Sequence, residues 1–598
     1  MTKRVKRNAR SVAAMVLVIL VTVIFSARLF QIQVVQASAY NEVSKDKRAV
    51  PVSIPGLRGD IADRNGVVLA STDERYDVQL SPKNTLVRDG VFYRQAPEGQ
   101  SGTVAVTTEE AYAEIAEITG QTADELRDIV DSALAKNKKS DFAYVQREVT
   151  LDQLNALKAL KVPWLTFAPN YQRFYPNGGV AGNLIGFSSS DQIPQAGVER
   201  SQDACLAGTD GVETYEKGAD GVALPGSHVV REKAENGGTV ELTIDRDLQW
   251  QAQQLVDEYN ARLGTEWVYA VLMDAKTGEL LAVAEDGSVD PGDLNAGDPE
   301  KREARSFVRP YEPGSTHKTV TVATLLEEGV ATPLTPYDTP WTMQPEAGVR
   351  FSDWFEHAVE PWTLTGIYVK SSNVGTAMLG TQVPAKTRYE YMRKFGLGES
   401  TDTGLPLEDS GLLYKPEKWD AQTSYNVTFG QGFSSTIIQT AGVYQTIANG
   451  GVRIPPKLVK GCRAQDGSFT PHESGDPVNV VSQETASSIL QMMETLVDDT
   501  WKDFLTIPGY RIGGKTGTGE QSDGQGHYRT DYVHSFASIF PIDDPQYVVV
   551  ASLGFPDSYT SGTTSSVSLV REIEEAAIRT LQVAPSTGTF EPLPIYSE

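Results

Sequence analysis

Residues 267–284 read WVYAVLMDAKTGELLAVA, two apolar runs separated by a short polar turn. This pattern predicts a β-hairpin. A second pair of apolar runs, residues 534–540 and 547–555, lies far downstream and flanks another turn. A sheet built from both ends of one segment, with helices inserted between its strands, is an α+β arrangement, and we expect it over residues 245–582.

Apolar residues at helical spacing predict the helices that accompany this sheet, at about residues 247–260, 316–328, 483–496 and 568–581. Ahead of the sheet, residues 48–240 contain short extended segments and a hairpin signal at Asn65-Gly66. A polar helical stretch, residues 108–136, is divided by Gly120 into two shorter helices. We therefore expect an elongated, mostly β or mixed domain over 48–240, and a tail over 583–598.

The start of the chain predicts a membrane anchor. Residues 11–27 carry no charge and follow a basic cluster, which consists of Lys3, Arg4, Lys6, Arg7 and Arg10. The cluster places residues 1–10 in the cytoplasm, residues 11–34 in the membrane, and the rest of the chain outside. A cleaved signal peptide ending near residues 37–39 is the alternative, but the apolar stretch is longer than a usual signal core.

Composition excludes several classes of function. Lys and Arg number 53 against 78 Asp and Glu, so the net charge is −25 and binding of nucleic acid is disfavoured. Two cysteines, Cys205 and Cys462, are too few for a disulfide scaffold, a zinc site or an iron–sulfur site, and we expect them to be unpaired.

Residues 312–318 (EPGSTHK) combine a hydroxyl and an amine at a helix start. Ser315 lies where free backbone N–H groups favour developing negative charge, and Lys318 lies on the same face one turn later. A lysine whose pKa is lowered by desolvation can take the proton of a serine and make it a nucleophile. The pattern Ser-x-x-Lys alone is common, and an N-cap with a surface charge is the simpler interpretation.

Two further motifs follow in order: Ser371-Ser372-Asn373, and Lys515-Thr516-Gly517-Thr518. Residues 509–516 also satisfy the phosphate-loop pattern G-x-x-x-x-G-K-T, but glycines follow where that motif requires a helix. We therefore expect an edge strand at 513–519. There the lysine and the threonine hydroxyls would bind a carboxylate, and the glycine would let a peptide lie against the backbone.

Taken together, the three motifs resemble those of the penicilloyl serine transferases. The N-terminal half resembles the class B penicillin-binding proteins, most of all their division-specific subgroup. Three segments carry this second resemblance: residues 58–70 (RGDIADRNGVVLA), 173–187 and 208–221.

The resemblance implies a peptidoglycan D,D-transpeptidase that is inhibited by β-lactams and needs no metal or cofactor. Ser315 would attack the D-Ala–D-Ala carbonyl with Lys318 as base, Ser371 would relay a proton, and Asn373 would position the substrate amide. The carboxylate would be bound by Lys515, Thr516, Gly517 and Thr518. Backbone N–H groups of Ser315 and Thr518 would form the oxyanion hole.

The implied partners are peptidoglycan stem peptides, lipid-linked or in nascent glycan, together with β-lactams, the membrane, a membrane glycosyltransferase and other division proteins. We find no segment for a glycosyltransferase and expect a monofunctional chain. His317 departs from the residues usual at its position, and we expect it to point away from the catalytic face. An elongation-type transpeptidase, a D,D-carboxypeptidase, a β-lactamase, a β-lactam sensor and an inactive division scaffold are the alternatives.

Overall fold

The described residues of this computed structural model, 9–96, 102–189, 192–216, 227–522 and 527–597, divide into two units. One unit joins Met1–Leu57 to Ala207–Gly237, and the other joins Arg58–Leu206 to Gly238–Glu598. Each unit is therefore assembled from segments that are distant in the sequence.

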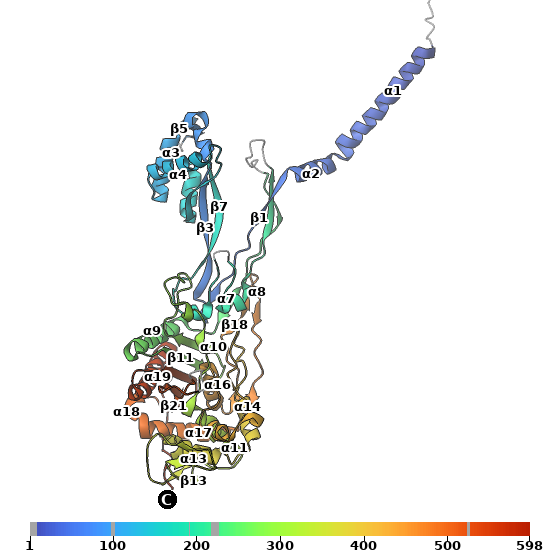
Figure 1. Cartoon of the computed structure of the whole chain (residues 1–598). Coiled ribbons are helices and arrows are strands. Elements are labelled where there is room, and N and C mark those ends of the chain that lie inside the picture. Colours follow the sequence, from blue (N-terminus) through green and yellow to red (C-terminus); the bar gives the residue numbers. More distant parts are fainter. Residues whose placement is uncertain (1–8, 97–101, 190–191, 217–226, 523–526, 598) are drawn as a thin grey trace, which may run out of the picture. The chain divides into compact units, whose positions relative to one another are not determined.

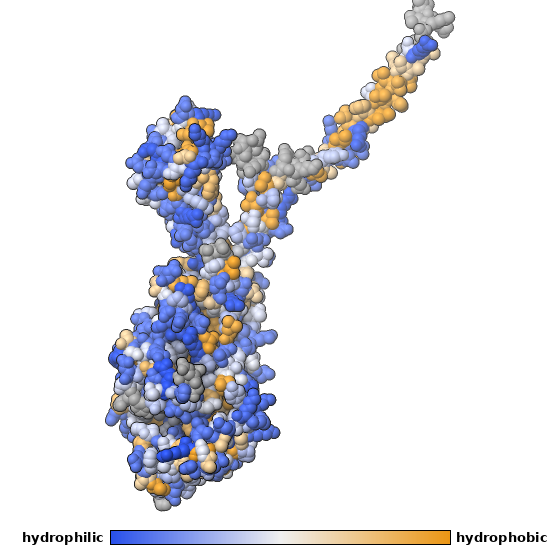
Figure 2. Space-filling view, viewed as in Figure 1, coloured by the Kyte–Doolittle hydropathy of each residue, from blue (hydrophilic) through white to orange (hydrophobic). Residues whose placement is uncertain are grey.

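The first unit begins with α1 (Ala9–Phe30), which a turn of π-helix continues to Val35. Figure 2 shows apolar side chains along α1, and the helix from Ala9 to Val35 is long and apolar enough to cross a membrane. Of the predicted basic cluster, only Arg10 lies among the described residues. After α2 (Ala37–Arg48), strand β1 (Ala49–Ile54) pairs with β8 (Gly211–Glu216), and β8 pairs with β9 (Val229–Glu232) (Figure 1).

The second unit contains a seven-stranded sheet in the order β19-β18-β10-β2-β3-β6, with β7 also paired to β3. The predicted hairpin at Asn65-Gly66 is confirmed, because the strands on either side of it pair antiparallel and Gly66 has a φ of 83°. The strands are β2 (Ile61–Ala62), β3 (Val68–Leu80), β6 (Ala143–Val149), β7 (Leu165–Phe174), β10 (Thr239–Leu242), β18 (Val459–Arg463) and β19 (Phe469–Pro471).

Three helices and a hairpin pack beside β3 and β6 around their own apolar core, which includes Ile115, Leu126, Leu154 and Trp164. The predicted division at Gly120 is confirmed, since this residue ends α3 in a left-handed conformation. Each of the three helices begins with a threonine capping box, which satisfies backbone N–H groups of the first turn. These elements are α3 (Thr108–Thr119), α4 (Ala123–Lys136), α5 (Leu151–Ala159), β4 (Val91–Gln95) and β5 (Thr103–Thr107).

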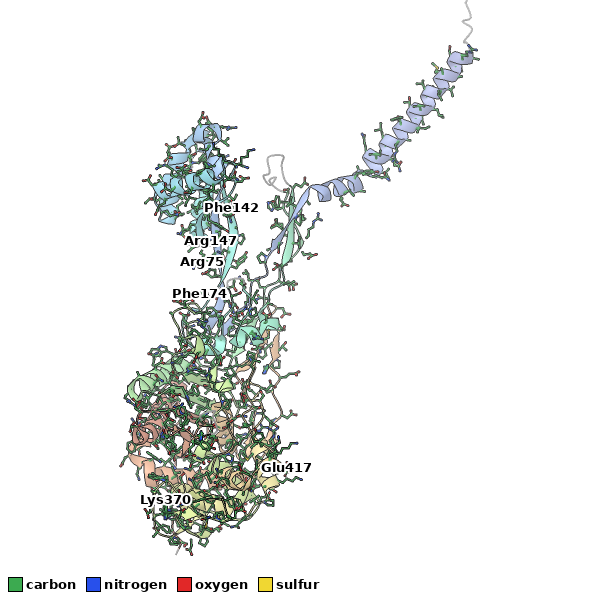
Figure 3. All side chains as sticks on the ribbon, in the orientation of Figure 1. Arg75, Phe142, Arg147, Phe174, Lys370 and Glu417 are labelled. Atoms are coloured by element: carbon green, nitrogen blue, oxygen red, sulfur yellow. A yellow bond between two sulfur atoms is a disulfide. The ribbon has the colours of Figure 1, made fainter. Side chains whose placement is uncertain are left out.

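The same part of the sheet also carries polar and exposed side chains. Arg75 and Arg147 lie between Phe142 and Phe174 along its strands (Figure 3). Phe142 and Phe174 are each about half exposed, and the Arg147 guanidinium lies 4.1 Å from the centre of the Tyr144 ring. Solvent therefore reaches this stretch of the sheet.

A five-stranded antiparallel sheet, in the order β12-β11-β23-β22-β21, forms the centre of the stretch predicted to be α+β, called here the α+β segment, and confirms that class. Both predicted hairpins are present, and β21 lies at the edge as expected. Every residue of β22 is buried, so both faces of the sheet are covered. The strands are β11 (Trp267–Asp274), β12 (Leu280–Glu285), β21 (Gly513–Gly519), β22 (Val533–Phe540) and β23 (Tyr547–Gly554).

Helices before, between and after these strands cover the sheet. α9 and α19 pack against each other and the sheet, whereas α16 and α17 contact the sheet and each other. The larger helices are α9 (Arg246–Leu263), α11 (Lys318–Glu327), α12 (Leu364–Val369), α13 (Asn373–Gly380), α14 (Ala385–Lys394), α15 (Ala421–Asn426), α16 (Ile437–Ala448), α17 (Gln483–Leu496) and α19 (Tyr559–Leu581). The last of these begins nine residues earlier than predicted.

Short elements complete this segment and the connection to the seven-stranded sheet. The short helices are α6 (Gly182–Ile185), α7 (Gly197–Ser201), α8 (Asp203–Leu206), α10 (Arg305–Val308) and α18 (Lys502–Leu505). The short strands pair as β13 (Pro336–Thr339) with β16 (Glu360–Thr363), β14 (Thr342–Met343) with β15 (Phe351–Ser352), and β17 (Val452–Arg453) with β20 (Val478–Asn479).

The prediction that the two cysteines are unpaired is wrong. Cys205 and Cys462 form a disulfide with their Cα atoms 5.9 Å apart, although 257 residues separate them in the sequence. The pairing follows from the seven-stranded sheet: β10 pairs with β18, which places Cys462 opposite Val240, and the Cys205 carbonyl accepts from the N–H of Gly238 just before β10. A count of cysteines could not reveal this contact, because it depends on strand pairing over a long distance.

The tail after α19 is held along the α+β segment by polar contacts. The Thr587 N–H donates to Asp543, and the Leu593 N–H donates to the Thr495 hydroxyl on α17 at 3.1 Å. Further on, the Ile595 carbonyl accepts from the N–H of Thr363, which precedes α12. The tail therefore runs from the end of α19 across α17 to the start of α12.

Candidate active site

Ser315 lies in a short 3-10 turn, Gly314–His317, that leads directly into α11. Gly314 has a φ of +57°, a conformation that glycine adopts without steric cost. Behind the turn, the Tyr444 hydroxyl donates to the Thr316 carbonyl at 2.9 Å. These contacts hold Ser315 in a partly exposed position at the start of the helix.

Strand β21 passes directly beside this turn because glycines remove the side chains that would block it. A Cβ atom on Gly517 would lie 2.8 Å from the Pro313 carbonyl, and one on Gly314 would lie 2.2 Å from the Thr518 carbonyl. Thr516 and Thr518 point to one face of β21 and are partly exposed, whereas Lys515, just before Thr516, is buried. The sequence 513–519 thus forms an edge strand whose backbone lies against the turn of Ser315.

Lys318, in the first turn of α11, is fully buried and hydrogen-bonded to the second motif, Ser371-Ser372-Asn373. Its Nζ donates to the Ser371 carbonyl and, at 2.7 Å, to Asn373 Oδ1, and it lies 3.3 Å from Ser371 Oγ. The carbonyl and the amide oxygen are acceptors only, so the amine is the donor in both bonds.

The hydroxyl of Ser371 lies between two buried amines. Its Oγ is 2.9 Å from Lys515 Nζ and 3.3 Å from Lys318 Nζ. Ser371 itself has a φ of +56°, an uncommon conformation for a residue other than glycine and one that concentrates at functional sites. The Nζ of the neighbouring Lys370 is paired with Asp499 at 2.8 Å.

Burial controls the charge of the two lysines. It lowers the pKa of Lys318 from 10.5 to about 7, and the negative charge of Asp353 opposes this shift. The pKa of Lys515 lies well below its usual value because of burial and, next, the positive charge of Lys318. One of the two amines can therefore be neutral near neutral pH, as a base must be.

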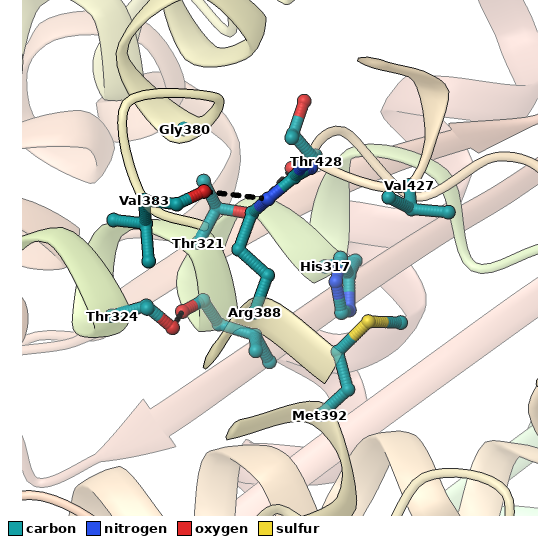
Figure 4. A pocket seen from close by; sticks show the side chains of 10 residues that line it. His317, Thr321, Thr324, Gly380, Val383, Arg388, Met392, Val427 and Thr428 are labelled. Atoms are coloured by element: carbon teal, nitrogen blue, oxygen red, sulfur yellow. Dashed lines mark hydrogen bonds between the residues drawn. The ribbon is translucent and has the colours of Figure 1, made fainter. Parts of the chain in front are cut away.

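His317 lies on the other side of the turn, in agreement with the expectation that it points away from the catalytic face. Its ring packs against Phe433, with 4.6 Å between ring centroids, and lines a small buried cavity with Thr321, Arg388 and Met392 (Figure 4). Burial lowers the pKa of His317 to about 3, so the ring is neutral.

Several residues that no motif identified support this arrangement. The Thr319 hydroxyl lies 2.9 Å from the Tyr368 hydroxyl and 3.1 Å from that of Tyr444, which links α11, α12 and α16. Lys515 Nζ lies 5.6 Å from the centre of the Tyr368 ring. The sequence carries no signal for these contacts, because they join residues from separate elements. In the part of the chain that the structure describes, no group of three or more His, Cys, Asp or Glu side chains could hold a metal ion.

The chain is similar to known proteins over most of its length. Residues 268–575 match the family described as the penicillin-binding protein transpeptidase domain, and residues 53–242 match the penicillin-binding protein dimerisation domain. The chain is 36% identical to penicillin-binding protein PbpB of Mycolicibacterium smegmatis, with 96% of this chain and 91% of the relative aligned. It is 29% identical to peptidoglycan D,D-transpeptidase FtsI of Escherichia coli, over 77% of this chain and 76% of the relative.

Solved structures are also similar. The crystal structure of penicillin-binding protein 3 from Mycobacterium tuberculosis in complex with aztreonam matches with a TM-score of 0.68 and 31% identity, covering 92% of this chain and all of the other.

Proposed function

Because the chain belongs to the class B penicillin-binding proteins, which are peptidoglycan D,D-transpeptidases, we propose that it cross-links stem peptides through an ester on Ser315. The observation that carries this proposal is the position of the Ser371 hydroxyl, within 3.3 Å of Lys318 Nζ and 2.9 Å of Lys515 Nζ. Three motifs that span about 200 residues thus supply one cluster of groups able to exchange protons.

In the acylation step, neutral Lys318 takes the Ser315 proton while Oγ attacks the carbonyl of the penultimate D-alanine. The negative charge that develops on the carbonyl oxygen is bound by the N–H groups of Ser315 and Thr518. The C–N bond then breaks, and the Ser371 hydroxyl relays a proton to the leaving D-alanine. Asn373 holds the substrate amide and Lys318 in place.

In the second step, the amine of a neighbouring stem peptide attacks the ester, the C–O bond breaks, and Ser315 regains its proton. Lys515, Thr516 and Thr518 bind the terminal carboxylate of the donor, which β-lactams imitate, while Gly517 leaves room for the peptide backbone. A covalent ester divides the reaction into two easier steps without a metal or a cofactor.

We assign residues 1–10 to the cytoplasm, 11–34 to a retained membrane anchor, 48–240 to a pedestal, 245–582 to the transpeptidase domain and 583–598 to a tail. The apolar helix from Ala9 to Val35 supports the anchor. The transpeptidase domain then lies outside the membrane, where stem peptides are cross-linked. We further propose a role in septal cell-wall synthesis together with a membrane glycosyltransferase and other division proteins, as the resemblance to the division-specific subgroup implies.

The test of this function is covalent labelling of the full chain by a fluorescent penicillin. The wild-type protein should form a long-lived ester, and Ser315→Ala should form none. Mass spectrometry of the labelled peptide should place the adduct on Ser315. Equal labelling of both proteins, or none of the wild type, would contradict the proposal.

A time course of the adduct separates the related activities. A transpeptidase keeps the ester until an acceptor amine arrives, whereas a β-lactamase or a carboxypeptidase releases free product quickly. Rapid hydrolysis of the ester without an acceptor would favour one of those alternatives.

A further inference from the structure

The short hairpin β14–β15 lies against the residue that contacts Lys318. The Asn373 Nδ2 group donates to the Ser352 carbonyl at 3.1 Å, at the end of β15. Because a carbonyl only accepts, the other end of the amide, Oδ1, faces Lys318 Nζ at 2.7 Å. The hairpin therefore determines which way the Asn373 amide faces.

Asp353, the residue after Ser352, supports the first turn of α13 and is only 5% exposed. Its Oδ1 accepts from the N–H of Val374, in the first turn of α13, at 2.9 Å. A carboxylate at the N-terminus of a helix is favoured by the unpaired N–H groups there. Asp353 thus holds the helix that begins with Asn373.

His357 completes this support. Its Nε2 lies 3.0 Å from Asp353 Oδ2, and its Nδ1 lies 2.6 Å from the Ala358 carbonyl. A carboxylate and a carbonyl are both acceptors, so the ring makes both hydrogen bonds only when both nitrogens carry hydrogen. In that state Asp353 and His357 form a buried ion pair, with the ring packed between Phe355 and Trp362.

Three titratable groups lie near the amine of Lys318. Lys515 approaches Ser371 from β21, and Asp353 lies behind Asn373 with its partner His357. Asp353 raises the pKa of Lys318, in opposition to burial. Its carboxylate is therefore close enough to act on the lysine electrostatically as well as through Asn373.

We propose that Asp353 is a positioning residue of the catalytic centre: paired with His357, it holds Asn373 through the N-terminus of α13 and places a negative charge behind Lys318. This inference rests on the proposed role of Lys318 as the base. It assigns a catalytic purpose to a residue that lies outside all three motifs.

The test measures the second-order rate of acylation by a fluorescent penicillin as a function of pH. Asp353→Asn keeps an oxygen for the Val374 N–H and removes the charge. Without that charge, Lys318 loses its proton more readily, so the acid limb of the profile should move to lower pH by about one unit. The maximal rate should also fall, because the Asn373 amide is held less firmly.

A second variant should move the limb in the opposite direction. His357→Gln leaves Asp353 with a neutral hydrogen-bond donor, so its negative charge is no longer compensated and the acid limb should move to higher pH. Asp338→Asn makes the same chemical change as Asp353→Asn at an exposed aspartate on β13, and it should leave the profile unchanged.

Opposite shifts in the two variants would support the proposal. A lower acylation rate in both variants, with the acid limb of the pH profile unshifted, would show that Asp353 acts only on folding. That result would overturn the proposal. If Asp353→Asn does not fold, the His357→Gln profile decides alone. Failure of the wild-type chain to form an ester would instead refute the proposed function, so the two failures are distinguishable.

Discussion

Replacing Gly314 with alanine should separate β21 from the nucleophile. The Cβ atom of the new residue would lie 2.2 Å from the Thr518 carbonyl oxygen, whereas real Cβ atoms essentially never approach closer than 3.0 Å. The strand would therefore have to retreat by at least 0.8 Å, the difference between these distances. The obstacle is backbone, which cannot turn aside as a flexible side chain can.

This displacement of β21 should mainly lower the rate of acylation. The N–H of Thr518 is one of the two proposed oxyanion donors, and loss of such a donor typically costs about 3–4 kcal/mol, or about 10²–10³-fold. A misplacement of about 1 Å in a catalytic group has an effect of the same order. The left-handed conformation of residue 314 should add about 1–2 kcal/mol of strain to the folded state.

The assay is the second-order rate of acylation by a fluorescent penicillin, together with the thermal midpoint of unfolding. Gly329→Ala is the matched control, since Gly329 lies just beyond the end of α11 with a φ of +65° and no atom within 4 Å of its Cβ position. The control should lower stability without slowing acylation. If Gly314→Ala reacts at a rate close to that of Gly329→Ala, the contact between the turn and β21 does not control the reaction.

Two other predictions follow from burial and from the disulfide. The base must be unprotonated, and the pKa of Lys318 is lowered to about 7. The acylation rate should therefore be near its maximum above pH 7 and fall about tenfold per pH unit well below it. A stopped-flow pH profile that stays flat from neutral pH into acid would contradict the assignment of Lys318 as the base. Replacing both Cys205 and Cys462 with serine should lower the free energy of unfolding by about 2–4 kcal/mol and leave β-lactam acylation intact. Thermal melts with and without reductant measure this loss. An unchanged midpoint of thermal unfolding would refute the prediction.

Local patterns predicted the elements of the fold well. The hairpin at Asn65-Gly66, the division of a helix at Gly120 and the edge position of β21 all depend on neighbouring residues, such as a glycine at a turn or apolar residues at strand spacing. Local patterns failed for a contact that depends on the pairing of strands far apart in the sequence. The disulfide between Cys205 and Cys462 exists because β10 and β18 pair, and no turn or periodicity reports that pairing.

The residues of the site divide in the same way. Ser315, Lys318, Ser371, Asn373 and the stretch from Lys515 to Thr518 could be named from the sequence because each motif is a short run with its own spacing. Asp353 and Tyr368 could not, because their role comes only from which elements fold against them.

The amino-acid sequence alone determined which chemical groups this protein possesses, the order in which they occur and the α+β class of the segment that carries them, since these depend on composition and short-range spacing. The tertiary structure decided which groups are buried together and how strongly they hold their protons. Burial lowers the pKa of the Lys318 amine to about 7, and that burial arises only when segments distant in the sequence pack around it.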